Sequence, residues 1–290
     1  MSVCLLFLEY LAKTDIFRIF APMKTTLLIS TYNFPVALNL CLESITRQTK
    51  MPDEVIVADD GSDDETRLVV QDWKGKLSVP LKHVWQEDTG FRLAEIRNKA
   101  LAVATGDYII QIDGDIIMER HFIQDHLHFA RQGQFVCGSR SRITEAFTNR
   151  LKAGERLRFS FLRPGLFDRM NALRCPLLVP LFRNYNHLRG CNMAYWRDDV
   201  LAINGYDEKI ASYGYEDEDV QERLKRTGKV KLFVKFMCIE YHVWHPEHPT
   251  RKNLAETRKL IDRNNAEELI RVEHGIDRHL GMQTATDGRQ

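Results

Sequence analysis

Short apolar runs rich in β-branched residues alternate with helix-length segments through the first half of the chain. Four of these runs have the length and composition of buried strands: 25–31, 54–58, 81–85 and 107–112. Three segments between them carry apolar residues at helical spacing: 36–47, 63–73 and 92–104. Strands separated by such helices form right-handed βαβ units, so the sequence predicts an α/β fold with a mostly parallel central sheet flanked by helices. Ser62 is a candidate N-cap of the second helix.

The composition excludes several classes of function. The 290 residues include 41 Lys and Arg against 40 Asp and Glu, and this balance gives no sign of a nucleic-acid partner. Six scattered cysteines without a C-x-x-C pair argue against a zinc site and against a disulfide framework. They indicate a reducing compartment, so we expect a cytoplasmic protein. No uncharged apolar run approaches the roughly 18 residues of a membrane span.

Polar clusters follow three of the predicted strands. They are Thr31-Tyr32-Asn33, Asp59-Asp60-Gly61-Ser62 and Asp113-Gly114-Asp115. Ligands of parallel α/β sheets bind at the carboxyl ends of strands, so we expect the three clusters to converge on one place.

The Asp113-Gly114-Asp115 cluster alone fits a polar turn with a helix N-cap, but the convergence favours a divalent metal. Mn²⁺ and Mg²⁺ prefer oxygen ligands such as these carboxylates. Extended geometry would put Asp113 and Asp115 on the same side, and Gly114 would let the backbone approach the ligand.

A second acidic cluster, Glu216-Asp217, lies at the start of a predicted helix, 217–226, after Gly214. A carboxylate in such a position can take the proton of an attacking hydroxyl group. We expect the helix N-terminus to keep both carboxylates ionised. The alternative is N-terminal helix charge without a chemical role.

Other polar and aromatic side chains allow two interpretations each. Arg92 and Arg97 could contact a phosphate or a ribose. The alternative is a solvated helix face, which is favoured for Arg92. His242 follows the predicted strand 237–241, and His245 could serve in its place as a metal ligand. Three further histidines are predicted to be structural or exposed: His121, His126 and His128. Three aromatic residues are sugar platforms or packing residues: Tyr213, Tyr215 and Trp244.

Six motifs, in this order, resemble those of family 2 inverting glycosyltransferases of the GT-A type: Ser30-Thr31-Tyr32-Asn33, Val57-Ala58-Asp59-Asp60-Gly61-Ser62-Asp63, Gly90-Phe91-Arg92-Leu93-Ala94, Arg97-Asn98, Asp113-Gly114-Asp115 and Tyr215-Glu216-Asp217. The second half, from Gly190-Cys191-Asn192-Met193-Ala194 to Asp217, resembles the carboxyl-terminal part of galactosyltransferases and chondroitin-polymerase-like enzymes. The resemblance covers roughly residues 24–250. It implies a GT-A type, Rossmann-like fold with a C-terminal acceptor-binding part.

The resemblance also implies roles for individual residues. Thr31 and Tyr32 would line the uracil and ribose, and Asp60 would accept a hydrogen bond from the uracil N3–H. Asp113 would contact the ribose or the metal, and Asp115 would be the main ligand of Mn²⁺ or Mg²⁺. A histidine after the last core strand, His242 or His245, would complete the metal shell. Three further residues belong to the predicted donor site: Asn33, Arg97 and Gly114. Asp217 matches the catalytic base, and Glu216 would meet the acceptor sugar with it.

The activity implied is metal-dependent, inverting transfer from a UDP-sugar of the Gal, GalNAc or GlcNAc type. The acceptor would be a glycan or lipid-linked glycan in surface polysaccharide synthesis, including lipopolysaccharide. One alternative is a non-catalytic subunit that binds sugar nucleotides or glycans. Another is a nucleotidyltransferase, but such enzymes usually carry a Gly-rich loop and a basic residue after the first strand. Here that position reads Ser30-Thr31-Tyr32-Asn33-Phe34-Pro35.

The predicted organisation has four parts. Residues 1–22 form an N-terminal extension, which an upstream start codon would explain because Met23 begins the first strand region; a short amphipathic helix is the alternative. Residues 23–140 form the nucleotide-sugar-binding half of one domain, 141–250 its acceptor-binding and catalytic half, and 251–290 a C-terminal helix (from about 253 to 273) and tail.

The segment 143–185 is basic, with eight Lys and Arg against three Asp and Glu. It is interpreted as a lid, an acceptor groove or a surface for peripheral contact with the inner face of the cell membrane.

Overall fold

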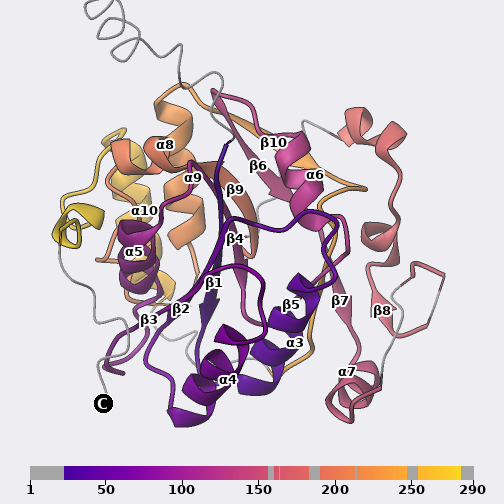
Figure 1. Ribbon diagram of the computed structural model, residues 1–290. Helices are drawn as coiled ribbons and strands as arrows, with labels where there is room; N and C mark the ends of the chain where they lie inside the picture. The colour runs from indigo at the N-terminus through magenta and orange to yellow at the C-terminus, as the bar shows by residue number, and fades with distance from the viewer. Residues whose placement is uncertain are drawn as a thin grey trace, which may run out of the picture.

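A seven-stranded sheet crosses the computed structural model in the strand order β10-β6-β9-β4-β1-β2-β3 (Figure 1). Its strands are β1 (Thr25–Thr31), β2 (Glu54–Asp59), β3 (Leu81–Trp85), β4 (Tyr108–Asp113), β6 (Gln134–Gly138), β9 (Asn192–Trp196) and β10 (Val230–Val234). β9 runs antiparallel to β4 and β6, whereas the other neighbours pair in parallel. The predicted α/β class with a mostly parallel central sheet is confirmed, and β1 to β4 are the four strands expected from the sequence.

The structure describes residues 23–155, 160–162, 164–182, 190–212, 214–246 and 254–281. Three predictions lie wholly or partly outside these residues. They concern the extension 1–22, the aromatic residue Tyr213 and parts of the basic segment 143–185. The division of the chain into four parts stays a prediction.

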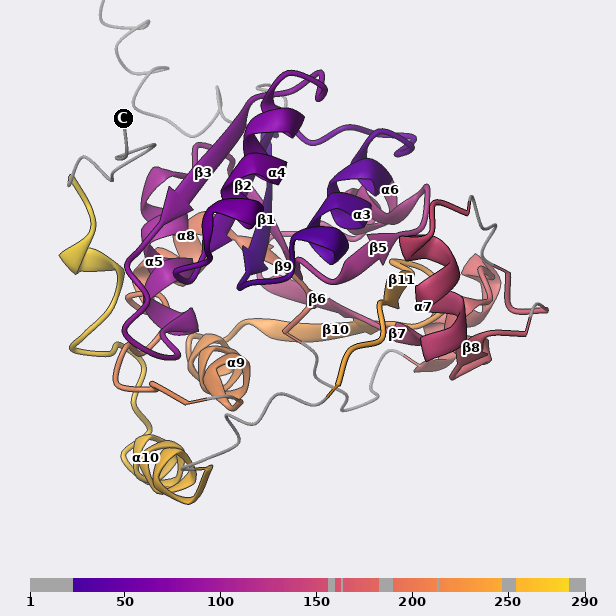
Figure 2. The same ribbon diagram turned by 90° about the horizontal axis from the view of Figure 1, so that it is seen from below.

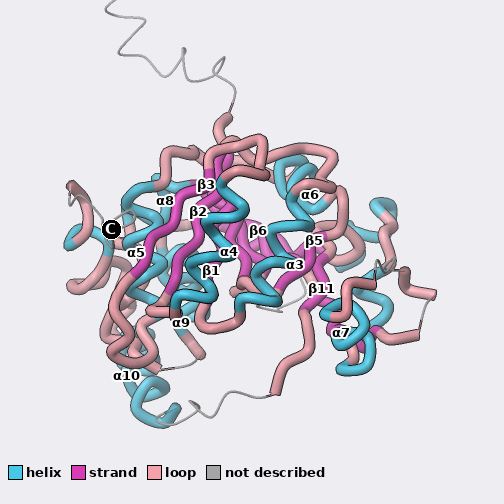
Figure 3. The backbone as a smooth tube through the Cα atoms, turned by 60° about the horizontal axis from the view of Figure 1, so that its bottom comes forward, coloured by secondary structure: helices cyan, strands magenta, loops and turns pink. Residues whose placement is uncertain are grey.

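Helices cover both faces of the central sheet, because successive residues of each buried strand point to opposite sides (Figure 3). In β1, Leu27 and Ile29 belong to one apolar core and Leu28 to the other. The first core includes side chains of α3 (Pro35–Ile45), α4 (Asp64–Lys74) and α6 (Phe122–His128). The second includes side chains of α5 (Leu93–Val103), α8 (Arg197–Ala202) and α9 (Glu216–Arg226). The central sheet is therefore the middle layer of three.

Two helix boundaries differ from the sequence prediction for identifiable reasons. Asp63, rather than Ser62, is the N-cap of α4, because its carboxylate accepts from the amides of Glu65 and Thr66. The helix α10 (Leu254–Ala266) packs against α9 and ends before residue 273. Glu268, just beyond its end, has a φ of 50°, a left-handed conformation that terminates helices.

A second, four-stranded sheet lies beside the first, in the order β5-β11-β7-β8 (Figure 2). Its strands are β5 (Ile116–Met118), β7 (Arg140–Ile143), β8 (Leu166–Phe167) and β11 (Glu240–His242). One face packs Ile117, Ile143 and Tyr241 into a third apolar core with α7 (Glu145–Lys152). By strand register, the opposite face carries Glu240 and His242. This opposite face adjoins the end of β4.

Short 3₁₀ turns complete the described chain: η1 (Arg169–Ala172), η2 (Pro176–Phe182) and η3 (Ile276–Arg278). Among the helices that the structure describes, none is long and apolar enough to cross a membrane. Within the same residues five cysteines are present, and all five are free thiols, in agreement with the predicted lack of a disulfide framework.

The imidazole of His126 on α6 is fully buried. Its Nε2 lies 3.0 Å from Asn192 Oδ1, and Nδ1 has no hydrogen-bond partner within the described residues. Burial lowers the pKa of His126 to about 4. It is therefore a neutral structural histidine, as one of the two sequence interpretations expected.

This burial predicts loss of stability in mild acid. At pH 7 the imidazole is neutral in both states, whereas between pH 6.5 and about 4 only the unfolded chain takes up its proton. Urea denaturation should therefore show that His126→Gln, which keeps a donor toward Asn192 but does not titrate, loses less stability than wild type over this range. The difference should reach roughly 2–3 kcal/mol. A pH-independent difference between the two proteins would contradict the prediction.

Candidate active site

The ends of β1, β2 and β4 lie side by side, as the sequence predicted for the polar clusters that follow them. Thr31 is in register with Asp59, and Ser30 with Asp113. The amide of Asp60 donates to Thr31 O at 3.0 Å, and the amide of Gly114 donates to Ser30 O at 2.7 Å. Parallel pairing thus brings the three clusters to one edge of the sheet.

Asp115, His242 and His245 form a compact group of potential metal ligands. Asp115 Oδ2 lies 3.1 Å from His242 Nε2 and 3.1 Å from His245 Nε2. One ligand atom from each side chain falls within 4.8 Å of the others. The small sheet builds this group, because β5 pairs with β11 and the Val243 amide donates to Asp115 O at 2.9 Å. Both histidines that the sequence left as alternatives are present.

The chemistry of this group fits a divalent cation. Although burial disfavours the ionised form, His242 and then His245 hold the pKa of Asp115 well below its usual range. The hydrogen bond to Asp115 raises the pKa of His245. Asp115 Oδ1 is buried and has no hydrogen-bond partner among the described residues. A carboxylate with an unpartnered oxygen and two imidazoles match the ligands that Mn²⁺ accepts.

Asp113 and Asp115 have different protein partners, and the expectation that Asp113 contacts the ribose or the metal stays a prediction. Asp113 Oδ1 accepts from Arg97 Nη2 at 3.2 Å. The backbone turns at Gly114 and Asp115 instead of continuing as a strand, so the two carboxylates contact different groups. Gly114 permits the close approach of β1, since a Cβ there would lie 3.0 Å from Thr31 Oγ1.

Arg97 on α5 connects three of the predicted site carboxylates. Its side chain is 1% exposed, and Nη1 donates to Asp217 Oδ1 at 2.9 Å and to Glu216 Oε1 at 3.3 Å. Its Nε donates to Ser30 Oγ at 3.1 Å, and the guanidinium stacks over the ring of Tyr206. These contacts hold the start of α9 against the end of β4.

Asp217 has one engaged and one available carboxylate oxygen. Besides Arg97, Gln111 Nε2 donates to Oδ1 at 3.4 Å and Tyr206 OH at 3.5 Å. Within the described part of the chain, no hydrogen bond reaches Oδ2. This oxygen lies against the backbone of Gly190, where an added Cβ would come within 1.4 Å of it. Only glycine can therefore occupy position 190 while Asp217 keeps this place.

Glu216 is buried at the start of α9. Its side chain is 7% exposed, and Oε2 is buried without a hydrogen-bond partner among the described residues. Burial, followed by the charge of Asp217, raises the pKa of Glu216 above its usual value, although Arg97 opposes this. Burial therefore acts against the ionised form that the sequence predicted for Glu216.

The predicted uracil-binding residues lie at the same sheet edge but already have partners. Asp60 is buried, with Oδ1 accepting from Gln86 Nε2 at 2.5 Å and Oδ2 from the Arg92 amide at 2.9 Å. Burial raises the pKa of Asp60 to about 6. The ring of Tyr32 is 40% exposed, and its hydroxyl donates to Asp88 Oδ2 at 3.0 Å. A half-exposed ring of this kind can stack on a base.

Asn33 joins two loops of the site. It has a φ of 43°, its amide donates to Ser62 Oγ at 2.8 Å, and its Oδ1 accepts from the Asp63 amide at 2.9 Å. The Arg92 guanidinium contacts Glu95 and the carbonyl of Glu87, which fits the predicted surface role better than a phosphate contact.

Of the predicted aromatic platforms, the structure describes Tyr215 and Trp244. Both are half-buried. Tyr215 is the N-cap of α9 with a φ of 74°, and Arg258 lies over its ring. The Trp244 amide donates to Thr148 Oγ1.

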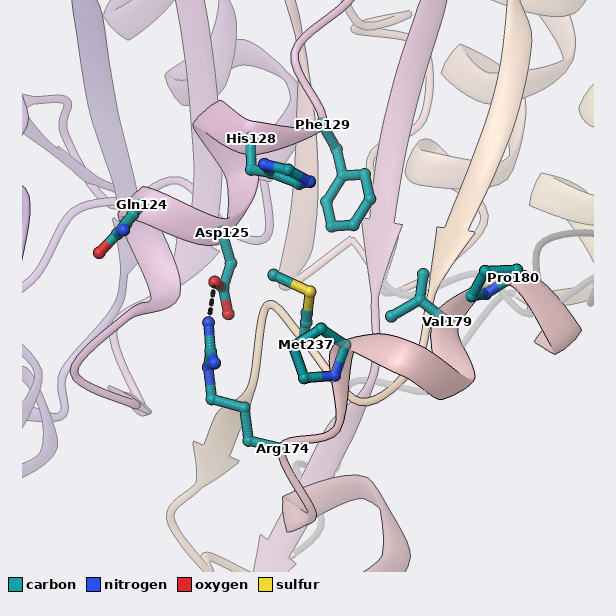
Figure 4. A pocket seen from close by; sticks show the side chains of 9 residues that line it. Gln124, Asp125, His128, Phe129, Arg174, Val179, Pro180 and Met237 are labelled. Atoms are coloured by element: carbon teal, nitrogen blue, oxygen red, sulfur yellow. Dashed lines mark hydrogen bonds and ion pairs between the residues drawn. The ribbon is translucent and has the colours of Figure 1, made fainter.

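A cavity of about 370 Å³ lies between α6 and η2, apart from this site (Figure 4). Asp125 and Arg174 form an ion pair at its polar side, and Phe129, Val179 and Met237 line it elsewhere. None of its lining residues is a candidate site residue.

Several residues of the site were missed in the sequence. Gln111 is fully buried and accepts from Tyr195 OH at 2.9 Å and Tyr206 OH at 2.6 Å. A glutamine inside an apolar strand, Tyr108-Ile109-Ile110-Gln111-Ile112, was the available signal for it. Tyr206 and Gly190 gave no comparable signal, because their roles depend on contacts with α9.

Comparison with known protein families gives two matches. The model described as Glycosyl transferase family 2 matches residues 26–187, and the model described as N-terminal domain of galactosyltransferase matches residues 181–246. Chondroitin synthase of Escherichia coli is 27% identical over 271 residues, which cover 84% of this chain and 38% of the synthase. The matched part of the chain spans 38% and 25% of the length of the chondroitin synthases of Escherichia coli and Pasteurella multocida. It spans 22% of the length of a validoxylamine A glucosyltransferase of Streptomyces hygroscopicus.

Two solved structures share the fold. The structure of S. aureus TarS 1–349 in complex with UDP-GlcNAc has a TM-score of 0.61 at 16% identity, covering 89% of this chain and 69% of that one. The mannosyltransferase PcManGT from Pyrobaculum calidifontis, in complex with GDP-Man and Mn²⁺, has a TM-score of 0.56 at 19% identity, covering 84% and 66%.

Proposed function

Because the chain belongs to glycosyl transferase family 2, we propose that it transfers a sugar from a UDP-sugar to a glycan or lipid-linked acceptor, with inversion and with a divalent metal. The family establishes a glycosyltransferase with a GT-A fold. The donor, the acceptor, the metal and the residue roles are parts of the proposal.

One observation carries the proposal. A candidate base, Asp217, and a candidate metal group around Asp115 both lie near Asp113, and Arg97 joins Asp113 to Asp217. A glycosyltransferase needs such an arrangement, with a base for the acceptor hydroxyl beside a cation for the departing diphosphate.

Asp115, His242 and His245 would hold Mn²⁺ or Mg²⁺. The two imidazoles favour Mn²⁺, because Mg²⁺ prefers oxygen ligands alone. When bound, the ion would supply positive charge to the diphosphate of the donor. The unpartnered Asp115 Oδ1 supports this assignment, since a buried oxygen without a partner costs about 1–3 kcal/mol unless a ligand satisfies it.

The residues of the chain would carry out the transfer as follows. Asp60 would accept from the uracil N3–H, and Tyr32 would stack on the base. Asp217 Oδ2 would take the proton of the acceptor hydroxyl as its oxygen bonds to C1 of the sugar. The bond from C1 to the phosphate oxygen breaks, and its electron pair leaves with UDP. Attack from the face opposite UDP inverts the configuration at C1.

The comparisons support the choice of donor and acceptor. UDP-GlcNAc is the ligand of the TarS structure, and the second family model is that of a galactosyltransferase domain. We therefore favour a Gal, GalNAc or GlcNAc donor. The similarity to chondroitin synthase supports an acceptor in polysaccharide synthesis.

Apolar side chains in the segment 143–185 support a peripheral contact with the membrane. Leu177 and Leu181 on η2 are 88% and 75% exposed, and Leu162 is 74% exposed. The excess of Lys and Arg in this segment matches an anionic lipid surface. Such a contact would bring the enzyme to a lipid-linked acceptor at the inner face of the cell membrane.

The activity itself is testable with the purified chain. UDP release should occur with one or few members of a panel of UDP-sugars in the presence of Mn²⁺, and EDTA should abolish it. Mn²⁺-dependent UDP binding in calorimetry should accompany the release. Neither release nor UDP binding for any donor would refute the proposal, whereas binding without release would indicate a missing acceptor.

The role of Asp217 predicts a selective loss of turnover in Asp217→Asn. Asparagine keeps the shape and the contact with Arg97 but cannot take a proton, so kcat should fall by about 10²–10⁴-fold. The Kd for UDP should stay within about twofold. Glu218→Gln, next along α9 and paired at the surface with Arg258, is the matched control and should keep wild-type turnover. Wild-type turnover in Asp217→Asn would exclude the base assignment.

The membrane contact predicts that the full chain floats with vesicles containing anionic phospholipid. The double variant Leu177→Ser, Leu181→Ser should reduce the fraction of protein bound to the vesicles several-fold. Its rate of UDP release with a water-soluble acceptor should equal that of wild type. Unchanged flotation of this variant, or no flotation of wild type, would remove the membrane contact from the proposal.

A further inference from the structure

The proposed function gives the departing diphosphate a divalent ion but no hydrogen-bond donor from a side chain. As the bond between C1 and the phosphate oxygen breaks, negative charge grows on the diphosphate, and charge-assisted hydrogen bonds stabilise it. Arg97 and Arg92 were the candidates from the sequence. In the structure Arg97 is surrounded by Asp113, Asp217 and Glu216, and Arg92 contacts Glu95 and a carbonyl group. All three guanidinium nitrogens of Arg97 donate to groups of the protein. Arg92 donates through its terminal nitrogens, and its Nε is buried without a partner among the described residues.

Arg140, which the sequence did not single out, lies beside the candidate metal group. It is the first residue of β7, which pairs in parallel with β11, so that Arg140 faces Glu240 and Arg142 faces His242. Paired residues of a parallel ladder project from the same face, and residues two apart share that face. Arg140 therefore shares the face of the small sheet that carries His242.

The guanidinium of Arg140 has few hydrogen-bond acceptors among the described residues. Its Nη1 lies 3.7 Å from Cys191 Sγ, a weak acceptor, and its Nε is buried without a partner among the described residues. No carboxylate of those residues lies at ion-pair distance from it. Cys191 follows Gly190, the residue against which Asp217 packs. Arg140 thus reaches from the face that carries His242 to Cys191, the neighbour of Gly190 in sequence.

The acid that faces Arg140 forms no ion pair with it in the described residues. Glu240 is paired with Arg140 across β11 and β7, but its Oε1 accepts from Cys191 Sγ at 3.1 Å. Although burial opposes its charge, Cys191 and Glu240, and then Asp115 and Asp113, raise the pKa of Arg140. Arg140 therefore interacts electrostatically with both Asp113 and Asp115.

We infer that Arg140 is a catalytic residue that binds the diphosphate of the donor and stabilises it as a leaving group. The inference rests on the proposed function and adds a residue to it. During transfer the electron pair of the breaking C1–O bond passes to the diphosphate oxygen, and the N–H groups of Arg140 donate to the diphosphate. The proton of the acceptor hydroxyl goes to Asp217, so charge and atoms balance without a further reactant.

The experiment compares the affinities of UDP and UMP, measured by calorimetry at one Mn²⁺ concentration. UMP lacks the second phosphate, so the ratio of the two affinities reports on diphosphate recognition alone. Arg140→Met should weaken UDP binding by at least about tenfold and leave UMP binding within about twofold. Arg140→Lys, which keeps one charge without the planar fork, should give an intermediate ratio. Arg142→Met is the matched control, because Arg142 is exposed and paired with Asp168.

If Arg140 had only a structural role, Arg140→Met would lower the melting temperature or weaken UDP and UMP binding equally. The ratio of the UDP affinity to the UMP affinity would then stay unchanged. The free-Mn²⁺ signal in electron paramagnetic resonance should show that Arg140→Met still binds the ion at least as tightly as wild type. An unchanged ratio in Arg140→Met, or in Arg140→Lys if the methionine variant does not fold, would overturn the inference and leave the proposed function intact. Absence of UDP and UMP binding by wild type would overturn both.

Discussion

The buried guanidinium of Arg97 is the interaction on which the arrangement of the site depends. One cation on α5 reaches the end of β1 at Ser30, the end of β4 at Asp113 and the start of α9 at Asp217. Removing one partner from a buried ion pair costs about 3–5 kcal/mol, so these elements are strongly held together. The position of the candidate base relative to the Asp-Gly-Asp cluster therefore follows from the charge balance around a single side chain.

The second half of the site follows from a different constraint, the pairing of the small sheet. Asp115 and His242 are far apart in sequence, but the antiparallel pairing of β5 with β11 places His242 opposite Ile116, next to Asp115. The same sheet pairs β11 with β7 and thereby brings Arg140 to the face that carries His242. Backbone hydrogen bonds of the small sheet thus bring the side chains of the candidate metal group together.

The sequence predicted those parts of the structure that local patterns determine. The four strands β1 to β4 and their polar ends have clear periodicity and turn residues, so their convergence followed from parallel topology alone. The small sheet was not predicted, because all four of its strands have four residues or fewer, a length over which no periodicity can be recognised. The raised pKa of Glu216 and the ion pairs of Arg97 depend on burial by residues distant in sequence, which local patterns do not report.

Arg97 and Arg140 differ in the partners that the surrounding protein gives to their guanidinium groups. Arg97 is matched by carboxylates and cannot accept another anion without losing them, so it serves to hold the site together. Arg140 has only a weak contact with the Cys191 thiol and no ion pair among the described residues, so we propose that its charge is available to a ligand. Before the donor binds, the carboxylates of Asp113, Asp115 and Asp217 would repel a diphosphate. In the proposed function, an ion held near Asp115 and the charge of Arg140 would together offset this repulsion.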